Sequence, residues 1–113
     1  MSAAPHILIA EDEHVSSLVL QRLLVKAGYE VTVVRDGKQA LQHAQKNSYA
    51  AMIVDWMLPE LDGIEVVRTI ATSNLDHKPK MLLCSVIDIP AAQEYAVAAG
   101  AHACFGGGVG SGC

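Results

Sequence analysis

Five short apolar segments recur along this chain, and stretches with helical periodicity separate them. Apolar runs lie at residues 6–10, 30–34, 50–54, 81–86 and 101–105. Runs of this length that are apolar throughout are typical of strands buried on both faces, as in parallel sheets. Because consecutive parallel strands need a crossover connection, the order β-α-β-α-β-α-β-α-β is expected. We therefore predict an α/β fold with a five-stranded parallel sheet covered on both faces.

The segments between the runs carry signals for helix starts and ends. Gly28 and Gly100 suit the position just after a helix, and Pro90 suits a first helical turn. Asp62 and Gly63 break the chain before another apolar-periodic stretch. The predicted helices lie within residues 14–28, 38–48, 64–73 and 91–100.

The bulk composition fits one globular domain. The chain has 113 residues, of which 51% are hydrophobic, and that is enough for a core without disulfides or metals. Its net charge is −4, and no run of Lys or Arg could follow a phosphate backbone, so we expect no nucleic-acid binding through this domain. No apolar stretch approaches the roughly 20 residues that cross a bilayer.

Cellular location and domain limits follow from the cysteines and the two ends. The three cysteines are odd in number and lack metal-ligand spacing, so free thiols in a reducing compartment are expected. The first residues lack the pattern of a signal peptide, and we expect a cytoplasmic protein. Five of the last eight residues are glycine. We therefore divide the chain into a domain over 1–105 and a flexible glycine-rich tail over 106–113.

Acidic and hydroxyl side chains stand where the apolar runs end. Glu11 and Asp12 follow the first run, Asp55 follows the third, and Ser85 lies at the end of the fourth. In open α/β sheets, ligands bind beyond the carboxyl ends of the strands. If the first and third strands are neighbours, three carboxylates meet at one edge.

Such a cluster favours a divalent cation. Close carboxylates repel one another, and Mg²⁺ relieves that repulsion through carboxylate and carbonyl oxygens. A carboxylate beside the ion can attack a phosphoryl group and form an acyl phosphate, while a nearby hydroxyl binds a phosphoryl oxygen. The plain alternative is that acids end these strands only because the strands end in solvent.

Four stretches carry a resemblance to a known family. The segments ILIAEDE, MIVDWMLPELDG, MLLCSV and AVAAGAHACF resemble the receiver domain of two-component response regulators, over about residues 6–105. The resemblance implies a doubly wound, flavodoxin-like fold with strand order 2-1-3-4-5.

The resemblance also implies a role for each site residue. Asp55 matches the phosphoacceptor and Ser85 the switch hydroxyl. Glu11, Asp12, Asp55 and the backbone carbonyl of Met57 match the Mg²⁺ ligands. Such domains receive a phosphoryl group from a phosphohistidine on a histidine kinase or phosphotransfer protein and then change conformation. Any catalysis would be limited to autophosphorylation and autodephosphorylation.

The sequence departs from the family in two places. A lysine usually follows the fifth strand, but Gly107 stands there and no lysine follows Lys80. Losing a charge-assisted contact of this kind costs about 3 kcal/mol, or two orders of magnitude in rate. The fifth helix is also missing, which should expose apolar sheet surface and favour self-association.

Two other functions compete with the phosphoacceptor. A pseudo-receiver would keep the fold and the acids but act as a protein-interaction module without phosphorylation, and the glycine at position 107 favours it. A small α/β hydrolase or phosphatase is disfavoured, because the chain has no G-x-S-x-G motif and no histidine placed as a base.

Overall fold

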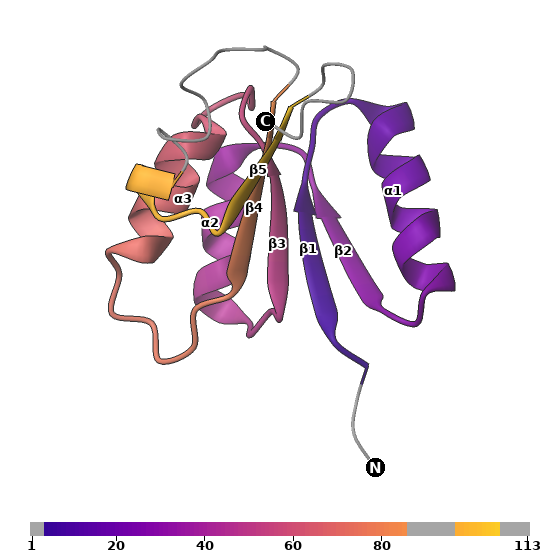
Figure 1. The fold of residues 1–113 in the computed structure, drawn as a ribbon, viewed down its shortest axis with the longest axis horizontal. Coiled ribbons are helices and arrows are strands. Elements are labelled where there is room, and N and C mark those ends of the chain that lie inside the picture. Colours follow the sequence, from indigo (N-terminus) through magenta and orange to yellow (C-terminus); the bar gives the residue numbers. More distant parts are fainter. Residues whose placement is uncertain (1–3, 86–96, 107–113) are drawn as a thin grey trace.

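The computed structural model describes residues 4–85 and 97–106, which form a parallel sheet flanked by helices (Figure 1). The strands are β1 (His6–Ala10), β2 (Glu30–Val34), β3 (Ala51–Asp55), β4 (Lys80–Ser85) and β5 (Ala103–Gly106). The helices are α1 (His14–Lys26), α2 (Gly37–Lys46) and α3 (Gly63–Ala71). Residues 97–99 are also helical.

The five strands form one sheet in the order β2-β1-β3-β4-β5, and every neighbouring pair is parallel. The predicted fold class and strand order are therefore confirmed. In the register, Ala10 lies between Val34 of β2 and Val54 of β3. All five strands end at the same edge, so the residues that follow β1, β2 and β3 are brought together there.

The core lies between the sheet and the helices α2 and α3, which pack against each other. Every second strand residue faces this side, as the alternation of a pleated strand requires. These buried strand residues are Leu8, Ala10, Met52, Val54, Met81 and Leu83. The helices contribute Ala40 and Ala44 of α2 and Val66, Val67 and Ile70 of α3 to the same cluster.

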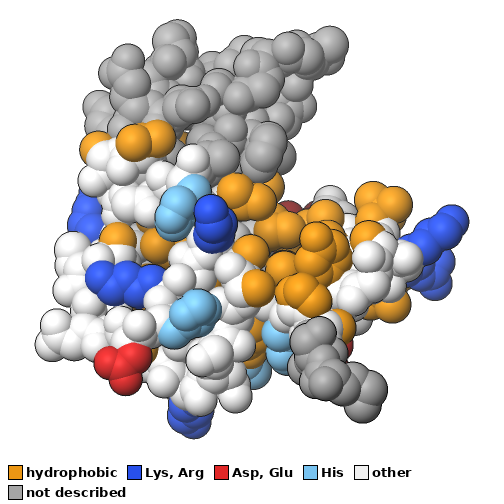
Figure 2. Space-filling view, turned by 60° about the horizontal axis from the view of Figure 1, so that its bottom comes forward, with side chains coloured by type: hydrophobic (Ala, Val, Ile, Leu, Met, Phe, Trp, Pro, Cys, Tyr) orange, Lys and Arg blue, Asp and Glu red, His pale blue; other side chains and the backbone are white. Residues whose placement is uncertain are grey.

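Helix α1 lies apart from α2 and α3, beside β2 (Figure 1). Its one buried residue is Ser17, whereas Val15 and Leu23 remain 63% and 61% exposed. The apolar residues that predict this helix are therefore largely uncovered. The face of the molecule drawn in Figure 2 has one area where hydrophobic side chains are gathered.

Element ends differ from the predicted limits by one or two residues. Strand β3 includes Asp55, because the ladder continues to its pairing with Cys84. Strand β5 begins at Ala103, although the backbone N–H of His102 already donates to the carbonyl of Met81 at 2.8 Å. Helix α3 ends at Ala71, whose carbonyl accepts from the Lys78 ammonium at 2.8 Å. The first part of the helix predicted over 91–100 and the tail from 107 onward lie outside the described residues.

Candidate functional site

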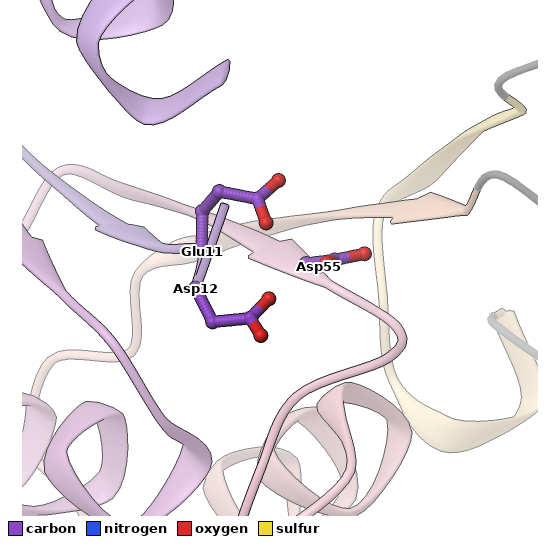
Figure 3. A group of neighbouring side chains, drawn as sticks. All are labelled: Glu11, Asp12 and Asp55. Atoms are coloured by element: carbon purple, nitrogen blue, oxygen red, sulfur yellow. The ribbon is translucent and has the colours of Figure 1, made fainter. Parts of the chain in front are cut away.

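Three carboxylates meet at the carboxyl edge of the sheet. Because β1 pairs directly with β3, Glu11 and Asp12 after β1 come next to Asp55 at the end of β3. One oxygen from each carboxylate lies within 4.8 Å of the other two. Figure 3 shows the three side chains converging from the two chain segments. The structure thus brings together the three acids that the sequence singles out.

Asp55 is the most perturbed of the three acids. It is half-buried, and its pKa is raised from 3.8 to about 7. Burial is the largest cause of this rise, followed by a hydrogen bond and like-charge repulsion from Glu11, and the charge of Asp12 contributes in the same direction. The backbone N–H of Met57, 3.4 Å from Asp55 Oδ1, acts in the opposite direction. Without a cation, one proton is therefore retained near neutral pH by this crowded group.

The donor set fits a small, hard cation. Three carboxylates within a few ångströms destabilise their own ionised forms, and a divalent ion would remove that penalty. Asp12 is exposed while Glu11 and Asp55 are half-buried, which leaves one side of the cluster open to water and substrate. Mg²⁺ characteristically keeps several waters beside a few protein oxygens, and this open cluster suits that habit.

The loop from β3 to α3 is held tightly over the site. The Gly63 N–H donates to the Trp56 carbonyl at 2.9 Å, and the Gly37 N–H donates to the Pro59 carbonyl at 3.1 Å. Between them Glu60 has a φ of 69°, in the region that favours glycine. The loop therefore begins at Asp55 and is fastened both to the start of α3 and to the start of α2.

Two further predicted site residues, Met57 and Ser85, lie after β3 and at the end of β4. Met57 stands two residues after Asp55 and its side chain is exposed. Ser85 is the last residue of β4, and its backbone pairs with Gly106. The Ser85 side chain lies outside the part of the structure that is described.

Cys84 lies opposite Asp55 in the sheet register. Burial, followed by the negative charges of Asp55 and Glu11, raises the pKa of its thiol to about 11. A thiol with such a pKa is a poor nucleophile at neutral pH, so Cys84 is a packing residue beside the site.

One residue at this edge was missed by sequence reasoning. Arg35 follows β2 directly, and its Nη1 donates to the Glu11 carbonyl at 3.3 Å and to the Ser17 hydroxyl at 2.7 Å. Its position after the second apolar run was the available signal. That run borders the first in the sheet, so the residue after it reaches the same edge as the acids.

The fold and the acid cluster agree with the family to which the sequence is related. Residues 7–105 match the response regulator receiver domain family. The chain therefore belongs to the response regulator receiver domains. Domains of this family act in two-component signalling and bind Mg²⁺ at their acidic site.

The curated relatives that the chain resembles are longer than this chain. The chain is 39% identical over 85 residues to the uncharacterized transcriptional regulatory protein YkoG of Bacillus subtilis, covering 75% of this chain and 37% of that protein. It is 33% identical over 99 residues to the sensory/regulatory protein RpfC of Xanthomonas campestris, covering 85% of this chain and 14% of that protein. The chain thus spans well under half the length of these relatives.

Solved structures support the same fold. The receiver domain of the sensor histidine kinase PA1611 from Pseudomonas aeruginosa, with a magnesium ion coordinated in its active site cleft, is 30% identical. It superimposes with a TM-score of 0.82, covering 92% of this chain and 85% of that one. In the part of the chain that the structure describes, no helix is both long and apolar enough to cross a membrane.

Proposed function

We propose that Asp55 is a phosphoacceptor that receives a phosphoryl group from a phosphohistidine on a histidine kinase or phosphotransfer protein. One Asp55 carboxylate oxygen attacks the phosphorus, an acyl phosphate forms, and the bond from phosphorus to the histidine nitrogen breaks. The Asp55 carboxylate is half-buried but lies beside the open, exposed side of the cluster, which gives the donor access.

The other residues at the edge bind the metal and the product. Glu11, Asp12, Asp55 and the Met57 carbonyl would hold Mg²⁺; within the acidic pair, Asp12 would bind the ion directly and Glu11 would act mainly through water. The bound ion would neutralise charge on the carboxylates and the phosphoryl oxygens. The Ser85 hydroxyl would donate to a phosphoryl oxygen and so link the modification to a conformational change.

The convergence of three carboxylates from β1 and β3, within 4.8 Å of one another, carries this proposal. Acids at the ends of strands are common, but acids crowded enough to raise the pKa of Asp55 to about 7 work against folding unless a cation or a proton joins them. A functional metal site explains why this arrangement is present in an otherwise ordinary sheet edge.

The decisive experiment uses a small phosphodonor. The protein is incubated with Mg²⁺ and acetyl phosphate, and intact mass spectrometry should show the gain of one phosphoryl group. Asp55→Asn should abolish the gain. Asp62→Asn is the matched control, because Asp62 lies in the same loop and makes no side-chain cap bond to α3. Mg²⁺ binding without any mass gain in the wild type would contradict phosphorylation and support a pseudo-receiver.

A second part of the proposal concerns self-association. Helix α1 exposes several large apolar side chains, and a contiguous apolar area of this kind is typical of interaction surfaces. These residues are Val15, Leu18, Val19 and Leu23. We expect sedimentation analysis to detect a concentration-dependent dimer, weakened in Leu23→Ser. A monomer at every concentration would exclude self-association.

The proposed setting is the cytoplasm, where free thiols such as Cys84 persist and kinases supply phosphohistidine. The proposed domain covers residues 1–105, with 106–113 as a glycine-rich extension. The relatives named above are much longer than this chain.

A further inference from the structure

Arg35 occupies a place at the sheet edge that the proposed chemistry does not use. It follows Val34, and Val34 pairs with Ala10 of β1, so Arg35 is the β2 counterpart of Glu11. The backbone carbonyl of Val34 accepts from the Glu11 N–H at 3.1 Å. The Arg35 side chain then donates to the Glu11 carbonyl at 3.3 Å. Both backbone polar groups of Glu11 are thereby bonded to consecutive residues of one chain segment.

The same guanidinium also forms hydrogen bonds with the first residues of α1. Its Nη1 donates to the Ser17 hydroxyl at 2.7 Å, and Ser17 is 1% exposed. Ser17 in turn donates to the His14 carbonyl at 2.9 Å. The Nη2 group of Arg35 lies 3.3 Å from His14 Nδ1, and since arginine only donates, the imidazole nitrogen accepts.

These contacts enclose the short segment that joins β1 to α1. That segment, residues 11–13, carries two of the three acids of the cluster. Its far end is fixed by Glu13, whose carboxylate accepts the Ser16 N–H at 2.6 Å. The Glu13 N–H donates to Glu11 Oε2 at 3.1 Å, which orients the Glu11 side chain. A planar fork with several donors in fixed directions is suited to holding such a loop.

The rest of α1 gives this loop little support. Ser17 is the one buried residue of the helix, and several of its apolar residues are exposed. A helix that buries little surface contributes little to fixing the loop before it. The bonds from Arg35 therefore add a restraint on where Glu11 and Asp12 stand relative to Asp55.

We infer that Arg35 is a positioning residue for the acidic cation site: it holds the β1–α1 segment so that Glu11 and Asp12 face Asp55. This inference rests on the proposed Mg²⁺-dependent function. The side-chain hydrogen bonds of Arg35 go to the Glu11 carbonyl, the Ser17 hydroxyl and His14, not to a carboxylate oxygen of the cluster. Arg35 acts through the Glu11 backbone and the Ser17 hydroxyl.

Positioning and simple electrostatics give opposite expectations, which makes the role testable. Arg35 is a positive charge near a cation site, so removing it should tighten Mg²⁺ binding if charge alone matters. If it positions the acids, removal should weaken binding by about tenfold, as for other groups that orient metal ligands. Mg²⁺ can be titrated with the fluorescence of Trp56, the single tryptophan, which packs partly buried beside the site, or by calorimetry.

The experiment compares four variants of the full chain under conditions where circular dichroism shows each to be folded. Arg35→Gln should weaken Mg²⁺ binding about tenfold. Arg35→Lys keeps the charge but loses the fork, and it should weaken binding by a smaller factor. Ser17→Ala removes one anchor and should also weaken it. Arg22→Gln, an equal charge change on the exposed side of α1, should not weaken it.

The outcomes separate the possible failures. Unchanged or tighter Mg²⁺ binding in both Arg35 variants overturns the positioning role, even if their melting temperatures fall. A purely structural role for Arg35 would lower stability without changing the Mg²⁺ affinity of the folded protein. A wild-type protein that binds no Mg²⁺ by either method overturns the proposed function together with this inference. Wild-type binding with normal Arg35 variants overturns the inference alone.

Discussion

The carbonyl oxygen of Asp55 lies so close to Gly63 that a Cβ atom placed on the glycine would stand 2.1 Å from it. The end of β3 and the first residue of α3 are in direct contact, and the intervening loop closes into the Gly63–Trp56 hydrogen bond of 2.9 Å. No side chain fits between them. Asp55 and the start of α3 are thus held in direct contact.

Gly63→Ala should therefore damage both folding and the site. The added methyl group must push the backbone of Asp55 or the start of α3, and overpacking of this kind costs about 1–3 kcal/mol. We expect a lower midpoint in urea unfolding and weaker Mg²⁺ binding, because Asp55 moves with the loop.

Gly28→Ala serves as the comparison. Nothing lies within 4 Å of a Cβ at that position, but its φ of 103° strains any other residue, at about 1 kcal/mol. It should lower the midpoint while leaving Mg²⁺ affinity unchanged. Equal loss of Mg²⁺ affinity in both variants would show that general destabilisation, not the contact with Asp55, is responsible.

The raised pKa of Asp55 predicts a pH-dependent stability for the metal-free protein. Between the ordinary value of 3.8 and about 7, the folded state keeps a proton that the unfolded state has lost. Stability should therefore fall as pH rises through this window and then level off. Thermal melts in EDTA across this range measure the slope.

Asp55→Asn is the control for that slope. It removes the titrating group, so its stability should depend less on pH, and above pH 7 the variant should be more stable than the metal-free wild type. Saturating Mg²⁺ should reverse the order, because only the wild type has the full set of carboxylates. Parallel pH profiles for the two proteins would refute the assignment of the raised pKa to Asp55.

The sequence predicts this fold well because the apolar runs and their terminal acids mark strands almost to the residue. The order of the strands within the sheet was harder to predict. The apolar runs show that β1 and β3 exist, but only the resemblance to receiver domains placed them side by side, and the site depends on that pairing. The acids themselves were recognisable because each follows a buried strand.

Two features could not be read from the sequence. The periodicity of α1 shows which of its faces is apolar, but not that residues such as Val15 stay uncovered, since coverage depends on what packs there. Arg35 was not singled out by any sequence pattern. Its importance appears only when the β1–β2 register places it beside Glu11.

Asp12→Asn should weaken Mg²⁺ binding with little effect on folding. Asp12 is exposed, so its amide is easily hydrated. A unit charge about 4 Å from another interacts by about 4 kcal/mol at an effective dielectric constant near 20, and partial desolvation offsets part of this. We expect an affinity loss of at least about tenfold in a fluorescence or calorimetric titration.

Asp76→Asn provides the matched control, since it removes the same charge from the exposed loop before β4, at the opposite end of the sheet. Its Mg²⁺ affinity should stay close to that of the wild type. A similar loss in both variants would mean that net charge governs binding, and the direct role of Asp12 would be rejected.

The absent lysine gives the sharpest test of how complete this site is. Gly107 follows β5 directly in the sequence and stands where the resemblance to receiver domains places a lysine. A donor aimed at developing negative charge contributes about a hundredfold in rate. Gly107→Lys should therefore accelerate phosphorylation by acetyl phosphate by up to that factor, measured by intact mass over time. Gly110→Lys, with the same charge farther along the chain, should leave the rate near that of the wild type. Equal rates in all three proteins would show that the Asp55 site does not depend on the lysine that other receiver domains carry.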